Sequence, residues 1–252
     1  MPIRRELPPR SVDSTDVMSG GVEPHYRKVL TRLLAAHALA EKLTALGYER
    51  VKEALGDSAL APEIEKNLRE ERKHARLIYR LLDELGTTQL AADRSMVSVL
   101  KSPSFAAPRH FAGKAASEMD LAMASLSLDM TGMIIIGANY QDSSYTPHAR
   151  AAESILEEEA DHEIFATEQL GRAAERFGAE AVEAALGEWL PRAVNFFGPP
   201  GSGFTYDCIR YGLKSRDNGE LAELYVTLLT RRCEQLGLKM PALTAAYPHS
   251  LA

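Results

Sequence analysis

Hydrophobic positions along the chain recur with the period of an amphipathic helix, and the period-two alternation of a half-buried strand is hard to find. In the first such stretch, Leu30, Leu33, Leu34 and His37 fall at positions i, i+3, i+4 and i+7 of one helix face. The pattern predicts an all-α protein. Long helices are expected over residues 26–55, 63–85, 113–140 and 147–177, and shorter ones over 179–190, 204–213 and 219–236.

Turn-forming residues separate these helices. The run Ser143-Ser-Tyr-Thr-Pro147 interrupts the chain before the fourth helix. Thr146 is the expected N-cap of that helix, and Pro147 suits its first position. Residues 87–110 are expected to be mainly loop with one short helix, and this connection is long enough to cross a helical bundle.

No internal repeat or clear boundary divides the chain into separate domains. Residues 1–23 are rich in Pro, Ser, Asp and Gly and are predicted to form an irregular N-terminal arm. Residues 24–252 are predicted to form a single helical domain, with a four-helix core over 26–178 and C-terminal helices over 179–241.

Composition and charge narrow the classes of function. The chain has 252 residues, of which 45% are hydrophobic and 25% charged, as in ordinary soluble proteins. The formal net charge of −6 argues against a general nucleic-acid-binding protein. The most apolar stretch contains Asp129, so no membrane span is predicted. Cys208 and Cys233 are interpreted as free thiols of a cytoplasmic protein, with a single disulfide as the less favoured alternative.

Two Glu-x-x-His motifs point to a metal site. Glu71 and His74 lie in the second long helix, and Glu159 and His162 lie in the fourth. The i, i+3 spacing puts both side chains of each motif on one helix face. A single such motif is weak evidence, because Glu and His are common on helix surfaces. Two motifs on separate long helices indicate a shared metal centre much more strongly.

A di-metal helical bundle also needs one inward-facing carboxylate from each of the other two helices. Glu41 lies in a small, apolar run of the first helix, and Asp129 lies in the apolar third helix. A helix that is apolar on every side is buried, and a buried carboxylate is costly unless it is paired or coordinates a metal. The alternative is that Asp129 faces a solvated groove or pairs with a basic side chain.

The spacing of these residues predicts two helical hairpins. Thirty residues separate Glu41 from Glu71, and thirty separate Asp129 from Glu159. Each hairpin would supply one carboxylate from its first helix and a Glu-x-x-His from its second. Carboxylate and imidazole ligands suit two iron ions, or less favourably manganese, with O2 as co-substrate. The predicted ligands of one ion are Glu41, Glu71 and His74, and those of the other are Asp129, Glu159 and His162, with some carboxylates bridging.

Several other residues are candidates for roles in or near this site. His37 lies one turn before Glu41 and is either a neighbour of the ligands or an ordinary core histidine. Glu158 is interpreted as part of a solvated helix face, or as a replacement ligand if the helix register differs. Four methionines at helical spacing are expected to pack in the core or to line an apolar substrate pocket; they are Met119, Met123, Met130 and Met133.

The combination of motifs resembles the ferritin-like phenylacetic acid catabolic family, and within it the catalytic subunit of the phenylacetyl-CoA ring epoxidase. The similarity runs from residue 26 to residue 241. Asn67, one turn before Glu71, stands where the family has a lysine. The matching segments are Tyr26-Arg-Lys-Val-Leu30, His37-Ala-Leu-Ala-Glu41, Glu71-x-x-His74, Ser144-Tyr-Thr-Pro-His-Ala-Arg150, Glu158-Glu-Ala-Asp-His162, Phe196-Phe-Gly-Pro199 and the tail from Asn218 to Pro241.

The resemblance implies a ferritin-like four-helix bundle with a C-terminal helical extension. It also implies a di-iron site, the use of O2, an aromatic substrate or an acyl thioester of CoA, an electron-donating reductase and a homologous partner subunit. The resulting hypothesis is a di-iron monooxygenase, either an epoxidase or a hydroxylase, that works as a homodimer or a heteromer without nucleic acid or membrane. Two alternatives remain open: a ferritin-type metal-binding protein with ferroxidase activity, and a structural subunit without catalysis.

Overall fold

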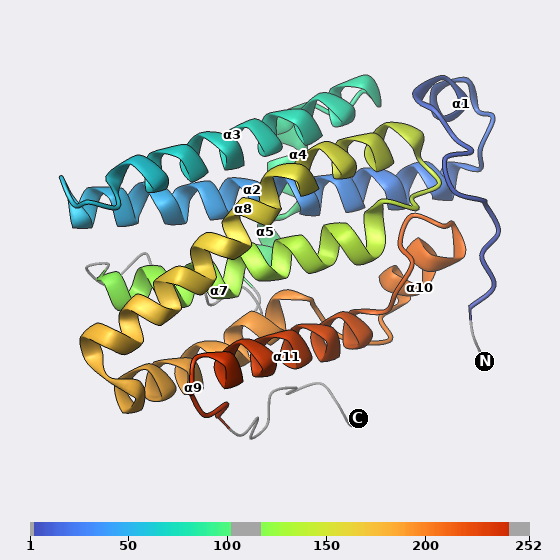
Figure 1. Ribbon diagram of the computed structural model, residues 1–252. Helices are drawn as coiled ribbons and strands as arrows, with labels where there is room; N and C mark the ends of the chain where they lie inside the picture. Colours follow the sequence, from blue (N-terminus) through green and yellow to red (C-terminus); the bar gives the residue numbers. More distant parts are fainter. Residues whose placement is uncertain (1–2, 102–116, 242–252) are drawn as a thin grey trace.

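The computed structural model describes residues 3–101 and 117–241, and within these ranges the chain is built from helices without a β-strand (Figure 1). The prediction of an all-α protein is confirmed. The long helices are α2 (Pro24–Leu55), α3 (Ala61–Glu84), α7 (Glu118–Ile135) and α8 (Thr146–Phe177). A π-helical turn, η2 (Ile136–Tyr140), continues α7 at its end.

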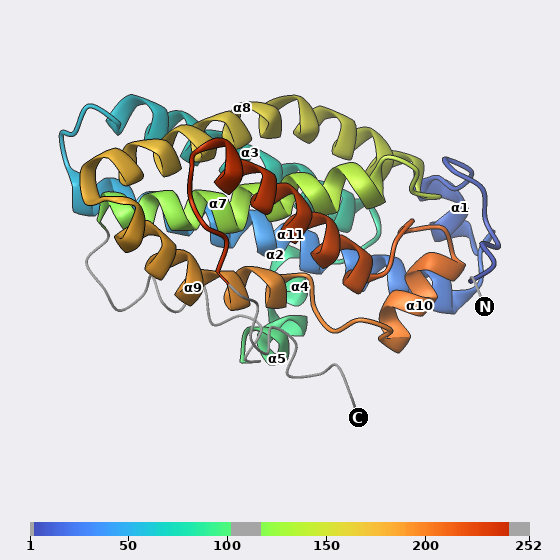
Figure 2. The same ribbon diagram turned by 60° about the horizontal axis from the view of Figure 1, so that its bottom comes forward.

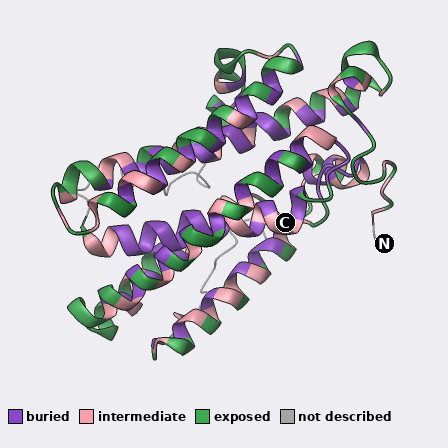
Figure 3. Cartoon of the chain, turned by 45° about the horizontal axis from the view of Figure 1, so that its top comes forward, coloured by how far each residue is buried: buried purple, intermediate pink, exposed green. Residues whose placement is uncertain are grey.

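These four helices form two antiparallel hairpins, α2 with α3 and α7 with α8, that lie side by side in Figure 1. Between the hairpins, α3 lies against α8 and α2 lies against α7. The exposed residues lie mainly on the outward faces of the helices and the buried residues line the interior (Figure 3). This is the four-helix bundle that the sequence predicts.

Helix α7 is the central helix of the protein. Every residue from Leu121 to Thr131 is buried, Asp129 included. By length and composition the segment Glu118–Tyr140 could cross a membrane, but 72% of its most apolar part is buried inside the protein. It is therefore a core helix, apolar all round because neighbours cover every side of it.

The C-terminal helices provide the outer cover of α7. Helices α9 (Ala179–Phe196) and α11 (Asn218–Gln235) lie across it, and α10 (Gly203–Arg210) packs on α2 (Figure 2). Helix α9 continues beyond its predicted end at residue 190, with Pro191 inside the helix. Proline removes one backbone hydrogen bond, but Ala193 and Val194 are buried against the core, and their burial offsets that loss.

Three local expectations differ from the structure. The N-terminal arm is not wholly irregular, because a capping box between Asp13 and Asp16 starts the short helix α1 (Ser14–Ser19), whose Val17 is buried. The described part of the 87–110 connection, up to residue 101, contains two helices, α4 (Gln89–Ser95) and α5 (Val97–Leu100), where one was expected.

The third difference is the N-cap of α8. Tyr145 occupies that position and Thr146 is already helical, because the buried Tyr145 ring is anchored by a hydrogen bond of 2.8 Å between its hydroxyl and that of Ser14. The predicted start of the third helix at residue 113 lies outside the described residues, as does the part of the connection beyond residue 101.

Candidate metal centre

The predicted site residues all point into the space between the two hairpins. Helix α2 supplies one of them, α3 two, α7 one and α8 two, and none is more than 5% exposed. The apolar face of each helix turns toward the core, and the acids and histidines lie within these faces. The residues that meet there are Glu41, Glu71, His74, Asp129, Glu159 and His162.

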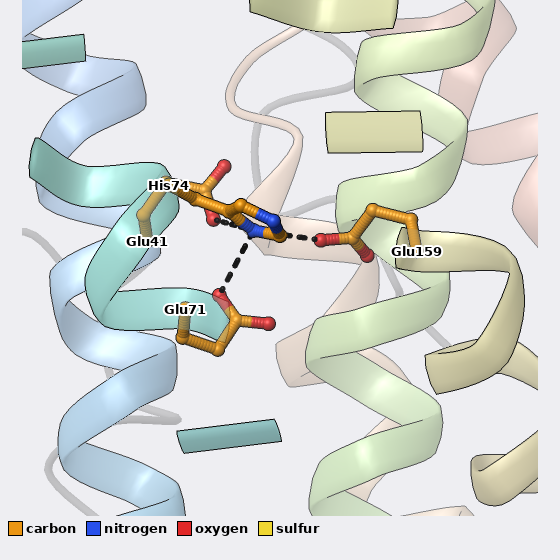
Figure 4. A group of neighbouring side chains, drawn as sticks. All are labelled: Glu41, Glu71, His74 and Glu159. Carbon is orange, nitrogen blue, oxygen red and sulfur yellow. Dashed lines mark ion pairs between the residues drawn. The ribbon is translucent and has the colours of Figure 1, made fainter. Parts of the chain in front are cut away.

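One group of possible metal ligands surrounds His74 (Figure 4). Its Nδ1 atom lies 3.6 Å from Glu41 Oε2 and 3.5 Å from Glu159 Oε1. Glu71 Oε2 lies 4.0 Å from the same nitrogen. Three carboxylates from three helices therefore converge on one imidazole nitrogen, an arrangement suited to a cation between them.

A second group surrounds His162 and consists of Glu71, Asp129 and His162. His162 Nδ1 lies 3.1 Å from Glu71 Oε1 and 3.8 Å from Glu159 Oε1. The two oxygens of Glu71 thus face different histidines, which is the geometry of a bridging carboxylate. Glu159, expected beside Asp129, groups with Glu41 and His74 instead, although its Oε1 lies between the two histidines.

Each histidine is held from behind by a carboxylate of the opposite hairpin. His74 Nε2 lies 2.9 Å from Glu158 Oε2, and His162 Nε2 lies 2.9 Å from Glu70 Oε2. Such a bond places the proton on Nε2 and leaves Nδ1 free to bind a metal. The interpretation of Glu158 as a solvated residue is therefore wrong. Glu70 was missed, although the repeated Glu-Glu-x-x-His pattern marks both acids.

Two side chains of α2 also hold the carboxylates of Glu41 and Asp129 in place. His37 Nε2 lies 2.8 Å from Glu41 Oε1, and its Nδ1 lies 3.0 Å from His148 Nε2. His37 is therefore the neighbour of a candidate ligand, one of the two roles expected for it. At the other end, the Tyr48 hydroxyl donates to Asp129 Oδ2 at 2.5 Å. Sequence reasoning assigned no role to Tyr48, an ordinary helix residue in the pattern, or to His148, which lies in one of the matching segments.

Four buried polar atoms of the centre have no hydrogen-bond partner among the described residues: His74 Nδ1, His162 Nδ1, Asp129 Oδ1 and Glu159 Oε2. Buried polar atoms are normally paired, and four unpaired ones in a single place require an explanation. All four are nitrogen or carboxylate oxygen atoms of the kinds that bind metal ions. The donor set therefore fits two divalent cations, with Glu41 and Glu71 completing it.

Without a bound cation, burial and mutual repulsion disfavour the ionised forms of most of these carboxylates. Burial, with the charges of Glu41 and Asp129, raises the pKa of Glu71 well above its ordinary value. Burial and the charge of Glu71 raise the pKa of Glu159 in the same way. Burial raises the pKa of Asp129 to about 7. At Glu41, burial opposes ionisation, but His37 and His74 prevail and lower the pKa. Metal cations would favour the ionised form of every carboxylate.

A cavity of about 590 Å³ adjoins the centre. Its wall is formed by α2, by α7 with η2, and by the C-terminal helices with the loop that joins α9 to α10. Glu41 is part of the wall, as is Gly132, where an added Cβ would lie 3.6 Å from Glu159 Oε2. The cavity therefore reaches the carboxylates. The four methionines named above pack in the apolar core instead of lining it; they are Met119, Met123, Met130 and Met133.

The profile of the phenylacetic acid catabolic protein family matches residues 21–249. The chain belongs to this family. Family members act in multicomponent oxygenase complexes, and they include both di-iron oxygenase subunits and non-catalytic subunits.

A solved structure shows the same fold. It is a protein from Synechococcus with aldehyde deformylating oxidase activity, aligned with a TM-score of 0.68 over 86% of this chain and 93% of its own. The two sequences are 18% identical, so the match supports the ferritin-like bundle and nothing finer. The comparison with curated proteins gives no match.

Proposed function

We propose that this family member is a di-iron, O2-dependent monooxygenase that acts on an aromatic or acyl-CoA-type substrate. The observation that supports the proposal most directly is the set of unpartnered, buried ligand atoms beside a cavity that could hold a substrate. Two iron ions in the centre would activate O2 and supply the oxidising power to attack an unactivated carbon. One oxygen atom would enter the substrate as an epoxide or hydroxyl, and the other would leave as water, with electrons supplied by a reductase.

The ligands proposed for the two ions are the residues that the structure brings together. Glu41 and His74 would bind one ion and Asp129 and His162 the other. Glu71 would bridge, because its two oxygens face different histidines. Glu159 completes the set between them.

The surrounding residues prepare the site. The outer carboxylates Glu70 and Glu158 fix the histidine tautomers, and Tyr48 fixes the orientation of Asp129. The centre lies among buried apolar side chains of α7, which limits the access of water to the reacting atoms.

The cavity wall supports an apolar, ring-bearing substrate. Aromatic side chains from η2, from the loop after α9 and from α10 contribute to it, namely Tyr140, Phe197 and Phe204. Apolar side chains bind the apolar surface of a ligand, and aromatic side chains also pack edge to face with an aromatic ring. A homologous subunit and a reductase are the partners expected from the family, and the two buried, free cysteines agree with a reducing compartment such as the cytoplasm.

The test is incorporation of isotopically labelled O2. Iron-loaded protein with a chemical reductant is incubated with aromatic acids and their CoA thioesters, and the products are examined by mass spectrometry. Label is expected in the product of the wild type and absent from Glu71→Ala. Glu63→Ala, an exposed acid on the same helix, is the matched control and retains activity. Iron oxidation without any labelled product would favour a ferroxidase, and the absence of both would favour a non-catalytic subunit.

A further inference from the structure

A buried lysine lies in the wall of the cavity, apart from the metal centre. Lys214 is in the segment between α10 and α11, it is 7% exposed, and it lines the cavity. Its Nζ donates to Asn218 Oδ1 at 2.6 Å. The Asn218 amide is itself fixed, because its Nδ2 donates to the carbonyl of Pro199 at 3.1 Å. The ammonium is therefore held in a defined position.

The charge of Lys214 is only partly offset by the protein, through the nearby charge of Asp217. Among the described residues it makes no ion pair with a carboxylate, and the one hydrogen-bond partner of its Nζ there is Asn218. Asp217 is close in sequence, but its carboxylate accepts from the backbone N–H groups of Gly201 and Gly219. An ammonium has three N–H donors, so this one retains donors and a charge for a ligand in the cavity. A buried, unpaired cation is costly, and burial lowers the pKa of Lys214 accordingly.

The distance between Lys214 and the metal centre limits the length of a ligand that could reach both. The residues that follow it, Ser215 and Arg216, donate their backbone N–H groups to Asn139 Oδ1, in η2. Gly132, beside Glu159, lies seven residues earlier along the same helix. At the rise of an α-helix, seven residues correspond to roughly 10 Å. The segment that carries the ammonium therefore lies at a distance from the metal centre that is about the length of one small aromatic acid.

We propose that Lys214 binds the carboxylate of a substrate whose apolar body extends along the cavity toward Glu41. The substrate class is then a free aryl or alkyl monocarboxylic acid. A carboxylate neutralises the buried charge and forms charge-assisted hydrogen bonds, whereas a neutral carbonyl leaves the charge uncompensated. The inference extends the proposed function by naming its substrate class, and it rests on that function for the reaction at the far end.

The experiment compares acids with their neutral amides. Phenylacetate, 4-phenylbutyrate and octanoate, each with the matching primary amide, are titrated calorimetrically into the full-length protein. The wild type is expected to prefer at least one acid over its amide by roughly 10- to 100-fold. Lys214→Met should abolish the preference while leaving the affinity for the amide unchanged. Lys214→Arg should retain most of it, and Lys239→Met, at an exposed lysine, should retain all of it.

The comparison of acid with amide separates this site from the metals. A carboxylate that bound only at the metal centre would show the same preference in the wild type and in Lys214→Met. That result would overturn the proposal, as would a wild type that binds no acid, or one that binds acid and amide equally. Metal content and helical circular dichroism of each variant check that it folds.

The outcomes for the two proposals are also distinct. Loss of acid preference in Lys214→Met supports the carboxylate site even if no labelled oxygen enters any product. Conversely, oxygenation of a CoA thioester at a rate that does not depend on Lys214 would support the oxygenase and overturn the carboxylate site.

Discussion

The outer carboxylates provide the sharpest test of how the centre is organised. Glu158→Gln and Glu70→Gln each remove one negative charge without changing the shape of the side chain. Each replaces a carboxylate 2.9 Å from the Nε2 atom of a histidine, and the Nδ1 atom of that histidine faces the other ligands. Loss of a partner behind a ligating histidine typically lowers metal affinity by roughly 10- to 100-fold.

The structure ranks the two substitutions. Glu158 is 25% exposed and also forms a close ion pair with Lys73, so part of its charge is already neutralised. Glu70 is 19% exposed, and Lys66 is 4.0 Å from it. We therefore expect about a 10-fold loss for Glu158→Gln, equivalent to about 1.4 kcal/mol, and a larger loss for Glu70→Gln.

The assay is competition for Fe(II) or Mn(II) against a chelator of known affinity. Because His74 and His162 share Glu71 and Glu159 as neighbours, the two substitutions are coupled, and the loss in the double variant should differ from the product of the single losses. Glu157→Gln, at the exposed neighbour, is the matched control and should bind metal as the wild type does. Equal affinity in Glu70→Gln and the wild type, or an equal loss in Glu157→Gln, would refute the reasoning.

Three further predictions follow from the same site. In metal-free protein, burial raises the pKa of Asp129 to about 7, so the folded state binds more protons than the unfolded state between the ordinary pKa of an aspartate and about pH 7. The melting temperature should therefore fall as the pH rises from about 5 to about 7; a rise over that range in circular dichroism melts would contradict the burial argument. Tyr48→Phe removes the donor to Asp129 and should weaken metal binding by about 1 kcal/mol, which the same chelator competition measures, while an unchanged affinity would show that Asp129 is positioned without it. Gly132→Leu fills the cavity where it meets Glu159 and should abolish product formation with metal content retained, whereas Gly132→Ala, which makes only ordinary contact, should retain both; full activity in the leucine variant would place the substrate elsewhere.

The chemical types of the site residues were predictable from the sequence, because their spacing is a property of single helices. The i, i+3 pairs and the acid in an apolar helix are local signals, and all six residues converge in the structure. The grouping around each histidine was not predictable. It depends on how the two hairpins are offset, which places Glu159 with His74 as well as beside its own motif partner His162.

The roles of residues that contact the opposite hairpin could not be predicted from the sequence. Glu158 looks like part of a charged surface, because its partner His74 lies 84 residues away in the chain. Tyr48 has no local signal at all, since its hydroxyl meets Asp129 only after the helices pack. The predicted end of α9 was wrong for a similar reason. Proline usually ends a helix, but packing of the turn after Pro191 against the core overrides that tendency.

The most direct test of the central claim is the metal content per chain of protein expressed in iron-supplemented medium, measured beside Glu71→Ala and Glu63→Ala. The account predicts about two irons per chain in the wild type and in Glu63→Ala, and a loss of iron in Glu71→Ala with the helical circular dichroism unchanged. A wild type that carries no iron or manganese, or a Glu71→Ala variant that retains its full iron content, would contradict it.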